Sequence, residues 1–150
     1  MDTSIVLTRG AEQNGLAREV RRRLLLNLAH PSRLLSFRKM WGTLVLVCRE
    51  ESPAAQSLGL SGAGTLTLRF DYGTLTIHEG RVGRPDVTIW GSAREILALN
   101  GWRVWVPGRV QGLALALFRT SRSTVGPEVF GRATHLRLLY RFARLLDGRE

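Results

Sequence analysis

The chain has 150 residues, a formal net charge of +10 and a single cysteine, Cys48. This length suits one domain with a sizeable core, and one cysteine excludes an intramolecular disulfide, which fits a reducing compartment. The first residues lack the pattern of a secretory signal, and the longest apolar run, 113–118, is far shorter than the ~20 residues that span a bilayer. We therefore expect a soluble, cytoplasmic protein.

Arginine carries almost all of the positive charge, since Lys39 is the only lysine. An excess of this kind suits an anionic partner. It follows equally well from the codon usage of a GC-rich genome, and the sequence leaves both interpretations open.

The first part of the chain is expected to be helical. Residues 1–15 are polar and contain glycine, which predicts a flexible N-terminal arm before a single domain over 16–150. Between 16 and 29 a leucine or valine recurs every fourth residue, the pattern of an amphipathic helix. Pro31 ends that helix, because the residue before a proline is pushed out of the α region. A short helix or turn over 32–40 completes a helical part over 16–40.

Strands are expected next. GTLVLVCR, residues 42–49, is apolar and β-branched, which predicts a strand, and a loop follows over 50–64. GTLTLRFD and GTLTIHEG then alternate apolar residues with polar ones, mainly threonine, as expected for an antiparallel hairpin that turns at Asp71-Tyr72-Gly73. After a turn over 80–84, DVTIW predicts a further strand with Val87 and Ile89 facing inward.

A helix with a well-defined start comes after this strand. Ser92 and Glu95 have the spacing of a capping box, in which each side chain binds the other residue's free backbone N–H. We expect this helix to reach about Leu99 and to stop at Asn100-Gly101.

The last third of the chain is harder to interpret. The alternating leucines and alanines of 110–118 fit a helix or a strand, and helix propensity favours the helix. TVGPEVFG suggests a last strand, which Pro127 would confine to the edge of the sheet. Residues 133–146 predict a closing amphipathic helix. Three of its arginines share one face, where they would contact an anionic surface: Arg137, Arg141 and Arg144.

Catalytic chemistry has little support in the sequence. The histidines His30, His78 and His135 are scattered without the spacing of metal ligands, and Cys48 lies in an apolar stretch. Asp86 begins a strand, where its expected role is to bind backbone N–H groups of the turn. Nucleic-acid binding has the charge but lacks a module signature. We expect neither enzyme activity nor a cofactor or metal ion.

The run LTLRFDYGTLTIHEGRVGRPDVTIWGSAREILALNG, together with EVFGRATHLRLLYRFARLL, resembles the sterol carrier protein 2 (SCP2) domain family over 42–146. The shared features are the hairpin, the glycine turn at Gly80, Pro85-Asp86 before a strand, the helix capped by Ser92, and Gly131 before a leucine-rich helix. This chain departs from the family in a longer, more aromatic segment over 102–125 and in Pro127. The resemblance implies an α+β fold with a twisted, mostly antiparallel sheet of about five strands and helices packed on one face.

The resemblance also implies an apolar tunnel that binds a fatty acyl, sterol or isoprenoid lipid without catalysis. Trp102 and Trp105 would lie at its mouth. We expect its lining to be Leu66, Leu68, Phe70, Leu75, Ile77, Val87, Ile89, Ile96, Leu99, Leu117, Leu139 and Phe142.

Other roles stay open, because the lining of a tunnel and an ordinary packed core look alike in sequence. The first alternative is an accessory or scaffold protein that uses the same fold for contact with a protein partner in a lipid or quinone pathway. The second, ranked third, is nucleic-acid binding through arginine. A transient contact with an anionic membrane is compatible with the first interpretation.

Overall fold

The computed structural model describes residues 2–48, 64–99, 117–119 and 128–147. Its helical elements are η1 (Ala11–Gln13), α1 (Gly15–Asn27), α2 (Pro31–Arg38), α4 (Ala93–Leu97), η2 (Ala133–His135) and α6 (Leu136–Asp147). Its strands are β1 (Ser4–Leu7), β2 (Trp41–Cys48), β3 (Thr65–Asp71), β4 (Thr74–Glu79), β5 (Val87–Gly91), β6 (Leu117–Arg119) and β7 (Glu128–Arg132).

The strands of the described part form one seven-stranded sheet in the order β1-β4-β3-β2-β5-β7-β6. Four of the neighbouring pairs are antiparallel, whereas β1 pairs with β4 and β2 pairs with β5 in parallel. The expected α+β class is confirmed. The sheet is mixed and wider than the mostly antiparallel, five-stranded sheet that we expected, because β1 and β6 extend it and the crossover from β4 places β5 parallel to β2.

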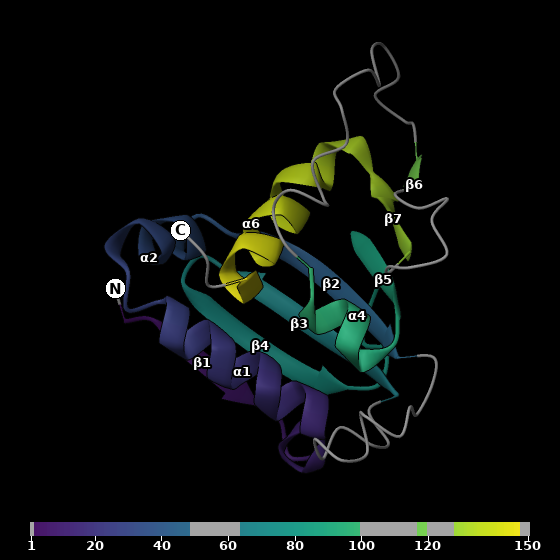
Figure 1. The fold of residues 1–150 in the computed structure, drawn as a ribbon, viewed down its shortest axis with the longest axis horizontal. Coiled ribbons are helices and arrows are strands. Elements are labelled where there is room, and N and C mark those ends of the chain that lie inside the picture. The colour runs from purple at the N-terminus through teal and green to yellow at the C-terminus, as the bar shows by residue number, and fades with distance from the viewer. Residues whose placement is uncertain (1, 49–63, 100–116, 120–127, 148–150) are drawn as a thin grey trace.

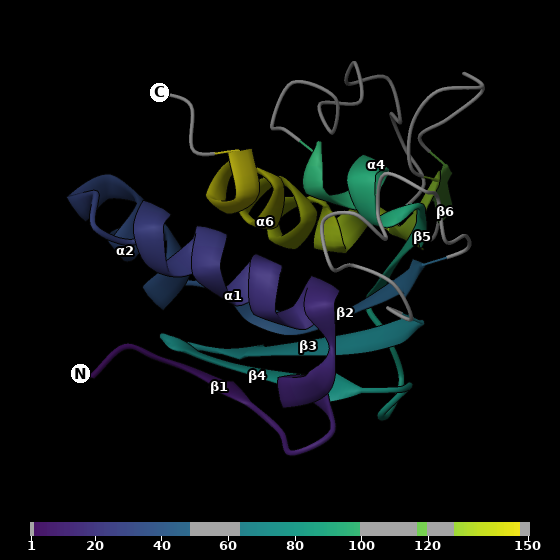
Figure 2. The same cartoon turned by 60° about the horizontal axis from the view of Figure 1, so that its bottom comes forward.

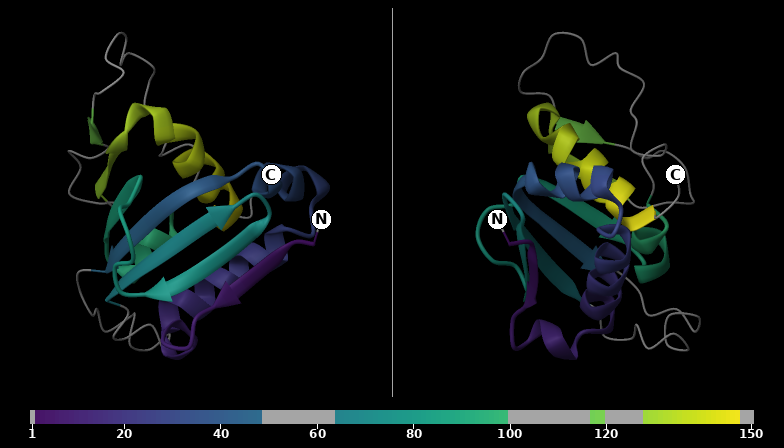
Figure 3. Two further views of the ribbon diagram at one scale, coloured as in Figure 1. Left: turned by 180° about the vertical axis from the view of Figure 1, so that it is seen from behind. Right: turned by 90° about the vertical axis from the view of Figure 1, so that its left-hand side faces the viewer.

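The helices lie on one face of this sheet. Figure 1 shows α1 and α6 over the strands, and Figure 2 shows the helical layer above the sheet with α2 at one end. On the opposite face, seen from behind in Figure 3, none of the described helices lies over β2, β3 and β4. Strands with one face packed and one face away from the core alternate apolar and polar residues, and β3 and β4 follow that rule.

The β3–β4 hairpin forms as the alternation predicts. Asp71 pairs with Thr74, so Tyr72 and Gly73 are the two turn residues. Both have positive φ, 43° for Tyr72 and 99° for Gly73, as a two-residue turn between twisted strands requires. Glycine adopts this conformation without steric strain, and the Asp-Tyr-Gly sequence therefore still makes a tight hairpin.

The N-terminal residues differ from expectation. Residues 1–15 were predicted to be a flexible arm, but Ser4–Leu7 pairs in parallel with Thr74–Ile77 as an edge strand. The Ser4 N–H donates to Gly73 O at 3.1 Å and the Thr8 N–H to Ile77 O at 3.0 Å. Pairing with β4 overrides the weak local signal of a four-residue strand.

The helix boundaries follow from their caps. Asn14 Oδ1 accepts from the Ala17 N–H at 3.1 Å and starts α1. The chain leaves the helix before Pro31, which then opens α2 as its first residue, a position where proline's missing N–H is harmless. At α4 the capping box is present, with Ser92 Oγ accepting from the Glu95 N–H at 3.1 Å and Glu95 Oε2 accepting from the Ser92 N–H at 3.3 Å.

Two expectations about the last strands are wrong. Leu117 and Phe118 were assigned to a helix, but Leu117–Arg119 is a strand that pairs with β7. β7 is not an edge strand, because it lies between β5 and β6. It begins at Glu128, just after the proline, so each of its residues retains a backbone N–H for pairing. Residues 50–63 of the expected loop over 50–64, and the expected stop at Asn100-Gly101, lie outside the described residues.

Candidate functional site

The candidate site is the apolar layer between the sheet and the helices. Side chains from β3, β4 and β5 line its sheet side, because alternate residues of a strand point to the same face. The members predicted from the sequence on this side are all at most 1% exposed: Leu66, Leu68, Phe70, Leu75, Ile77, Val87 and Ile89.

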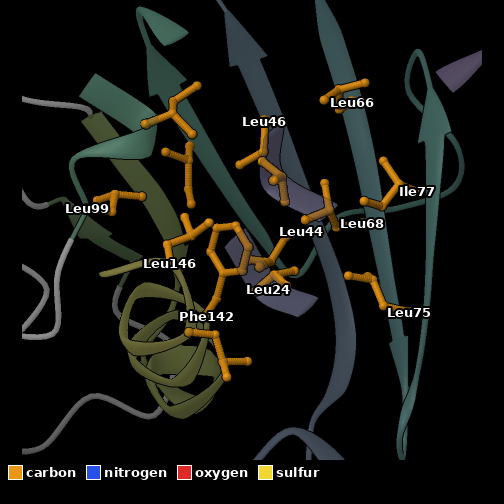
Figure 4. Close-up of a cluster of buried hydrophobic side chains, with 14 of the residues drawn as sticks. Leu24, Leu44, Leu46, Leu66, Leu68, Leu75, Ile77, Leu99, Phe142 and Leu146 are labelled. Carbon is orange, nitrogen blue, oxygen red and sulfur yellow. The ribbon is translucent and has the colours of Figure 1, made fainter. Parts of the chain in front are cut away.

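The helical layer contributes the other wall. Ile96 on α4, Leu99 just after α4, and Leu139 and Phe142 on α6 are at most 2% exposed and belong to the same cluster. Figure 4 shows Phe142 and Leu146 pointing from α6 toward Leu44 on β2. The structure therefore brings together eleven of the twelve residues that we expected to line a tunnel.

The twelfth residue and the expected mouth cannot be placed in this layer. Leu117 lies in β6 at the register position opposite Arg132, where only the backbone is described. Trp102 and Trp105 lie outside the described residues.

Several further residues belong to the layer but were absent from the predicted lining. Leu44 and Leu46 on β2 occupy its centre, with Leu24 from α1 and Leu146 from α6 around them (Figure 4). The alternation of 42–48 carried the signal for the two β2 leucines. It was obscured because Val45, which points to the opposite face, is also apolar and is only 2% exposed.

The eleven side chains pack against one another and against other side chains. Exposed fractions of 0–2% leave almost none of their surface within reach of a water molecule, as in the close-packed interior of a protein. An apolar ligand in this layer would therefore have to displace packed side chains. Whether these residues contact a ligand stays a prediction.

The two ends of the apolar layer differ in composition. Near α2, Phe37 and Phe142 both meet Phe70 edge-to-face, with ring centroids 6.1 Å apart and interplanar angles of 76° and 67°. Near α4, the described members are aliphatic, among them Leu46, Ile89 and Ile96. Edge-to-face pairs fix ring orientations and add stability beyond their burial, so the aliphatic end is the easier one to rearrange.

Buried polar groups lie at the margins of the layer. Thr67 faces the opposite side of the sheet, where its hydroxyl donates to Gly80 O at 2.7 Å and accepts from the Val82 N–H at 3.0 Å. Asn14 caps α1, and Arg33 Nη1 donates to Asn27 Oδ1 at 3.3 Å. In the described part of the chain, no buried side-chain nitrogen or oxygen lacks a partner. These residues therefore offer no unsatisfied group for the polar end of a ligand.

Three directional contacts of the described residues hold α6, and all of them lie at its periphery. His135 Nε2, just before α6, lies 3.5 Å from Asp86 Oδ1, and Asn27 Nδ2 donates to Leu145 O near its C-terminal end. Between them, Arg141 Nη1 donates to Lys39 O at 3.0 Å. The face of α6 toward β2 is apolar, so a small shift of the helix breaks no buried hydrogen bond.

The three predicted arginines share the outer side of α6 but differ in exposure. Arg137 and Arg144 are exposed, and the Arg144 guanidinium lies 5.9 Å from the centre of the Tyr140 ring. Arg141 is half-buried, because it binds the carbonyl of Lys39. Two of the three are therefore presented to solvent.

Among the residues that the structure describes, no three His, Cys, Asp or Glu side chains are grouped to hold a metal ion. No helix among the same residues is long and apolar enough to cross a bilayer. Asp86 binds backbone as expected, although its partner is Thr43 on β2 rather than its own turn.

Comparison of the chain with protein-family models, with curated proteins and with solved structures found no match. The resemblance to the sterol carrier protein 2 domain family therefore stays a prediction that rests on the glycine and hydrophobic patterns of residues 42–146.

Proposed function

We propose that this chain binds an apolar lipid, such as a fatty acyl chain, between its sheet and its helices, and that it acts without catalysis of its own. One observation carries the proposal: the interface of α4 and α6 with β2 and β5 is built from aliphatic side chains and Phe142. Sites for small apolar ligands are lined mainly by such residues. The resemblance to the sterol carrier protein 2 family supports the same conclusion.

Ligand entry requires that the free energy needed to separate the packed side chains of the layer be smaller than the free energy gained by burying the ligand. Each methylene removed from water contributes about 0.8 kcal/mol, so ten of them contribute roughly 8 kcal/mol. That is comparable with the whole stability of a domain, about 5–15 kcal/mol. The ligand can displace side chains only where the contacts are non-directional, and the aliphatic end next to α4 meets this condition. We place the ligand there, between Leu46, Ile96 and Leu99.

The first experiment is to purify the protein under native conditions, extract it with organic solvent and identify bound lipid by mass spectrometry. One dominant lipid in near-stoichiometric amount is the expected result. A blank extract, combined with no uptake of a fluorescent fatty acid, would show that the apolar layer is only a core.

A matched pair of variants then locates the ligand. Leu46→Phe adds volume at the aliphatic end, whereas Leu75→Phe adds the same volume on β4, where Figure 1 shows α1 above the sheet. Both changes overpack the interior by a similar amount. Only Leu46→Phe is expected to reduce fatty acid uptake, and an equal reduction in both variants would contradict the assigned position.

A protein-contact role is the second candidate, because the face of the sheet without helices exposes two tryptophans. Trp41 is 58% exposed at the start of β2 and Trp90 is 38% exposed on β5. Tryptophan is enriched among the residues that dominate protein interfaces. Recovery of one specific partner that is lost with Trp41→Ala, together with a ligand-free interior, would favour this function over lipid binding.

A further inference from the structure

Charge is distributed unevenly over the described surface. The exposed charged residues of the four α-helices are all basic: Arg18, Arg21, Arg22, Arg94, Arg137 and Arg144. The acidic residues of the same helices, Glu19, Glu95 and Asp147, are only half-exposed. Glu19 binds Arg22 and Arg23, and Glu95 accepts from the Ser92 N–H. The α-helices therefore present positive charge to solvent, and the exposed carboxylates of the helical side lie outside them, at Glu12 on η1 and Glu79 at the end of β4.

The opposite side of the molecule carries mixed charge. Arg69 on β3, with Arg81 and Arg84 in the crossover between β4 and β5, is exposed there. An exposed carboxylate, Asp71, lies on β3 on the same face as Arg69. The sheet side thus carries basic residues next to a carboxylate, whereas the exposed charged residues of the α-helices are all basic, and the sheet-side arginines therefore serve as an internal control.

Large apolar side chains accompany the positive charge at one end of the helical layer. Leu25 and Leu26 in the last turns of α1 are 46% and 61% exposed, and Leu35 on α2 is 57% exposed. Residues 29–32 between them are also exposed. We name residues 25–35 the α1–α2 corner. Exposure of leucine side chains to water is unfavourable, so a group of them on the surface indicates a contact site. Apolar residues beside a basic surface are typical of interfacial membrane contacts.

The α1–α2 corner is fixed next to the basic face of α6. Asn27, within the corner, donates to Leu145 O, and Arg141 donates to the carbonyl of Lys39, the residue after α2. The leucines of the corner and the arginines of α6 therefore belong to one continuous part of the molecule. Figure 2 shows α1, α2 and α6 together on the same side of the sheet.

We propose that this surface docks on an anionic lipid bilayer, with the helical arginines at the phosphate headgroups and the leucines of the α1–α2 corner entering the interfacial region. A nucleic acid would match the arginines but leave the leucines unused, and therefore a bilayer accounts for both. The proposal deepens the proposed function, because a carrier of an apolar ligand has to exchange it with a membrane. Its observations do not depend on a ligand inside the apolar layer.

The charge arm of the test uses flotation with vesicles of phosphatidylcholine and phosphatidylglycerol, compared with phosphatidylcholine alone. The variant Arg18→Gln/Arg137→Gln/Arg144→Gln removes three charges from the helical side, and Arg69→Gln/Arg81→Gln/Arg84→Gln removes three from the sheet side. Each basic residue near an anionic bilayer strengthens binding roughly fivefold, so the helical variant should lose on the order of a hundredfold. The sheet-side variant should lose far less.

The apolar arm compares Leu26→Ser/Leu35→Ser in the α1–α2 corner with Val6→Ser/Val82→Ser on exposed valines of the sheet side. The leucine pair should weaken vesicle binding by at least about tenfold, and the valine pair should leave it unchanged. Far-ultraviolet circular dichroism and urea midpoints establish that each variant is folded.

Three results would overturn the proposal: no vesicle binding at low salt, equal losses in both charge variants, or unchanged binding of the leucine pair. Fatty acid uptake measured on the same proteins separates this proposal from the proposed function. Loss of vesicle binding in the helical variants with uptake retained supports docking as a separate property. If the unsubstituted protein binds vesicles but takes up no fatty acid, the proposed interior ligand is contradicted and the proposed docking surface is still supported.

Discussion

Asp86 and Thr43 exchange two hydrogen bonds that join the crossover segment to the middle of the sheet. The Thr43 N–H donates to Asp86 Oδ2 and the Asp86 N–H donates to Thr43 O, both at 2.9 Å. The same carboxylate lies 3.5 Å from His135, just before α6. One side chain thus connects β2, the start of β5 and the segment that leads into the helix covering the apolar layer.

Removal of this carboxylate should therefore destabilise the protein substantially. Asp86→Ala leaves the half-buried Thr43 N–H without its partner, and a lost hydrogen bond to a charged group is expected to lower the free energy of unfolding by about 1.5–3 kcal/mol. Asp86→Asn keeps one oxygen acceptor and should lose less. Urea unfolding at constant pH measures both. A change below about 0.5 kcal/mol for Asp86→Ala, the level of an ordinary surface substitution, would contradict the role of Asp86.

The second prediction concerns Gly42, whose α-carbon lies close to the Asp86 carboxylate. Its φ is +129°, and an added Cβ would lie 2.8 Å from Leu138 Cδ2 and 3.0 Å from Asp86 Oδ2. Gly42→Ala should therefore suffer backbone strain and a steric clash together, a loss of at least about 2 kcal/mol. Gly80→Ala is the control, since Gly80 also has positive φ, +79°, but has nothing within 4 Å of the added Cβ.

The outcome of the glycine pair is read from the difference between the two free energies of unfolding. Gly80→Ala should lose only the strain of a left-handed residue, about 1–2 kcal/mol, so Gly42→Ala must be the worse of the two. Equal losses would show that Leu138 and Asp86 move aside without penalty.

Local patterns predicted the local elements correctly. The alternation of Leu66, Leu68 and Phe70 with polar residues correctly predicted which face of β3 is buried. The spacing of Ser92 and Glu95 correctly predicted the capping box. Both signals arise within a few residues of the chain, where the sequence directly specifies which groups can pair. The eleven described residues of the predicted lining share one layer for the same reason.

Long-range pairing was beyond the reach of these patterns. The parallel pairing of Ser4–Leu7 with β4 depends on residues about 70 positions away, and SIVL alone lacks the length of a convincing strand. The leucines and alanines of 110–118 have good helix propensity, but pairing with β7 determines the conformation of Leu117 and Phe118. A tunnel lining and a packed core need the same apolar residues, so the sequence could name the members of the layer without showing whether they enclose a ligand.

The third prediction concerns α4, whose five residues make it dependent on its cap. Ser92 Oγ accepts from the Glu95 N–H at 3.1 Å, and short helices have little intrinsic stability. Ser92→Ala should lower the free energy of unfolding by about 1 kcal/mol. It should also increase amide hydrogen exchange at Ile96 and Leu99, which form part of the apolar layer.

Ser32→Ala provides the control for the cap, because Ser32 is an exposed residue of α2. Its substitution should change stability by less than about 0.5 kcal/mol. If the two alanine variants unfold at the same urea concentration, the capping box contributes nothing measurable to the fold.

The last prediction is a pH dependence at Glu19. Hydrogen bonding to Arg22, above all, lowers the pKa of Glu19 to about 2; Arg23 lowers it further, while burial opposes the shift. Arg22 Nη2 lies 2.6 Å and Arg23 Nε lies 2.9 Å from Glu19 Oε1, and Arg23 Nη1 also donates to Leu97 O at 2.8 Å. The carboxylate thus positions the arginine that joins α1 to α4.

Because the folded-state pKa is depressed, the stabilisation by ionised Glu19 is present above the ordinary pKa of 4.5 and is lost as the pH falls toward 2. Glu19→Gln should be less stable than the unsubstituted protein near neutral pH, by less than about 1 kcal/mol because the pair is largely at the surface. Urea midpoints measured at decreasing pH should converge for the two proteins. The double variant Glu19→Gln/Arg22→Gln should lose less than the sum of the single losses, and additive losses would show that the ion pair does not contribute to stability.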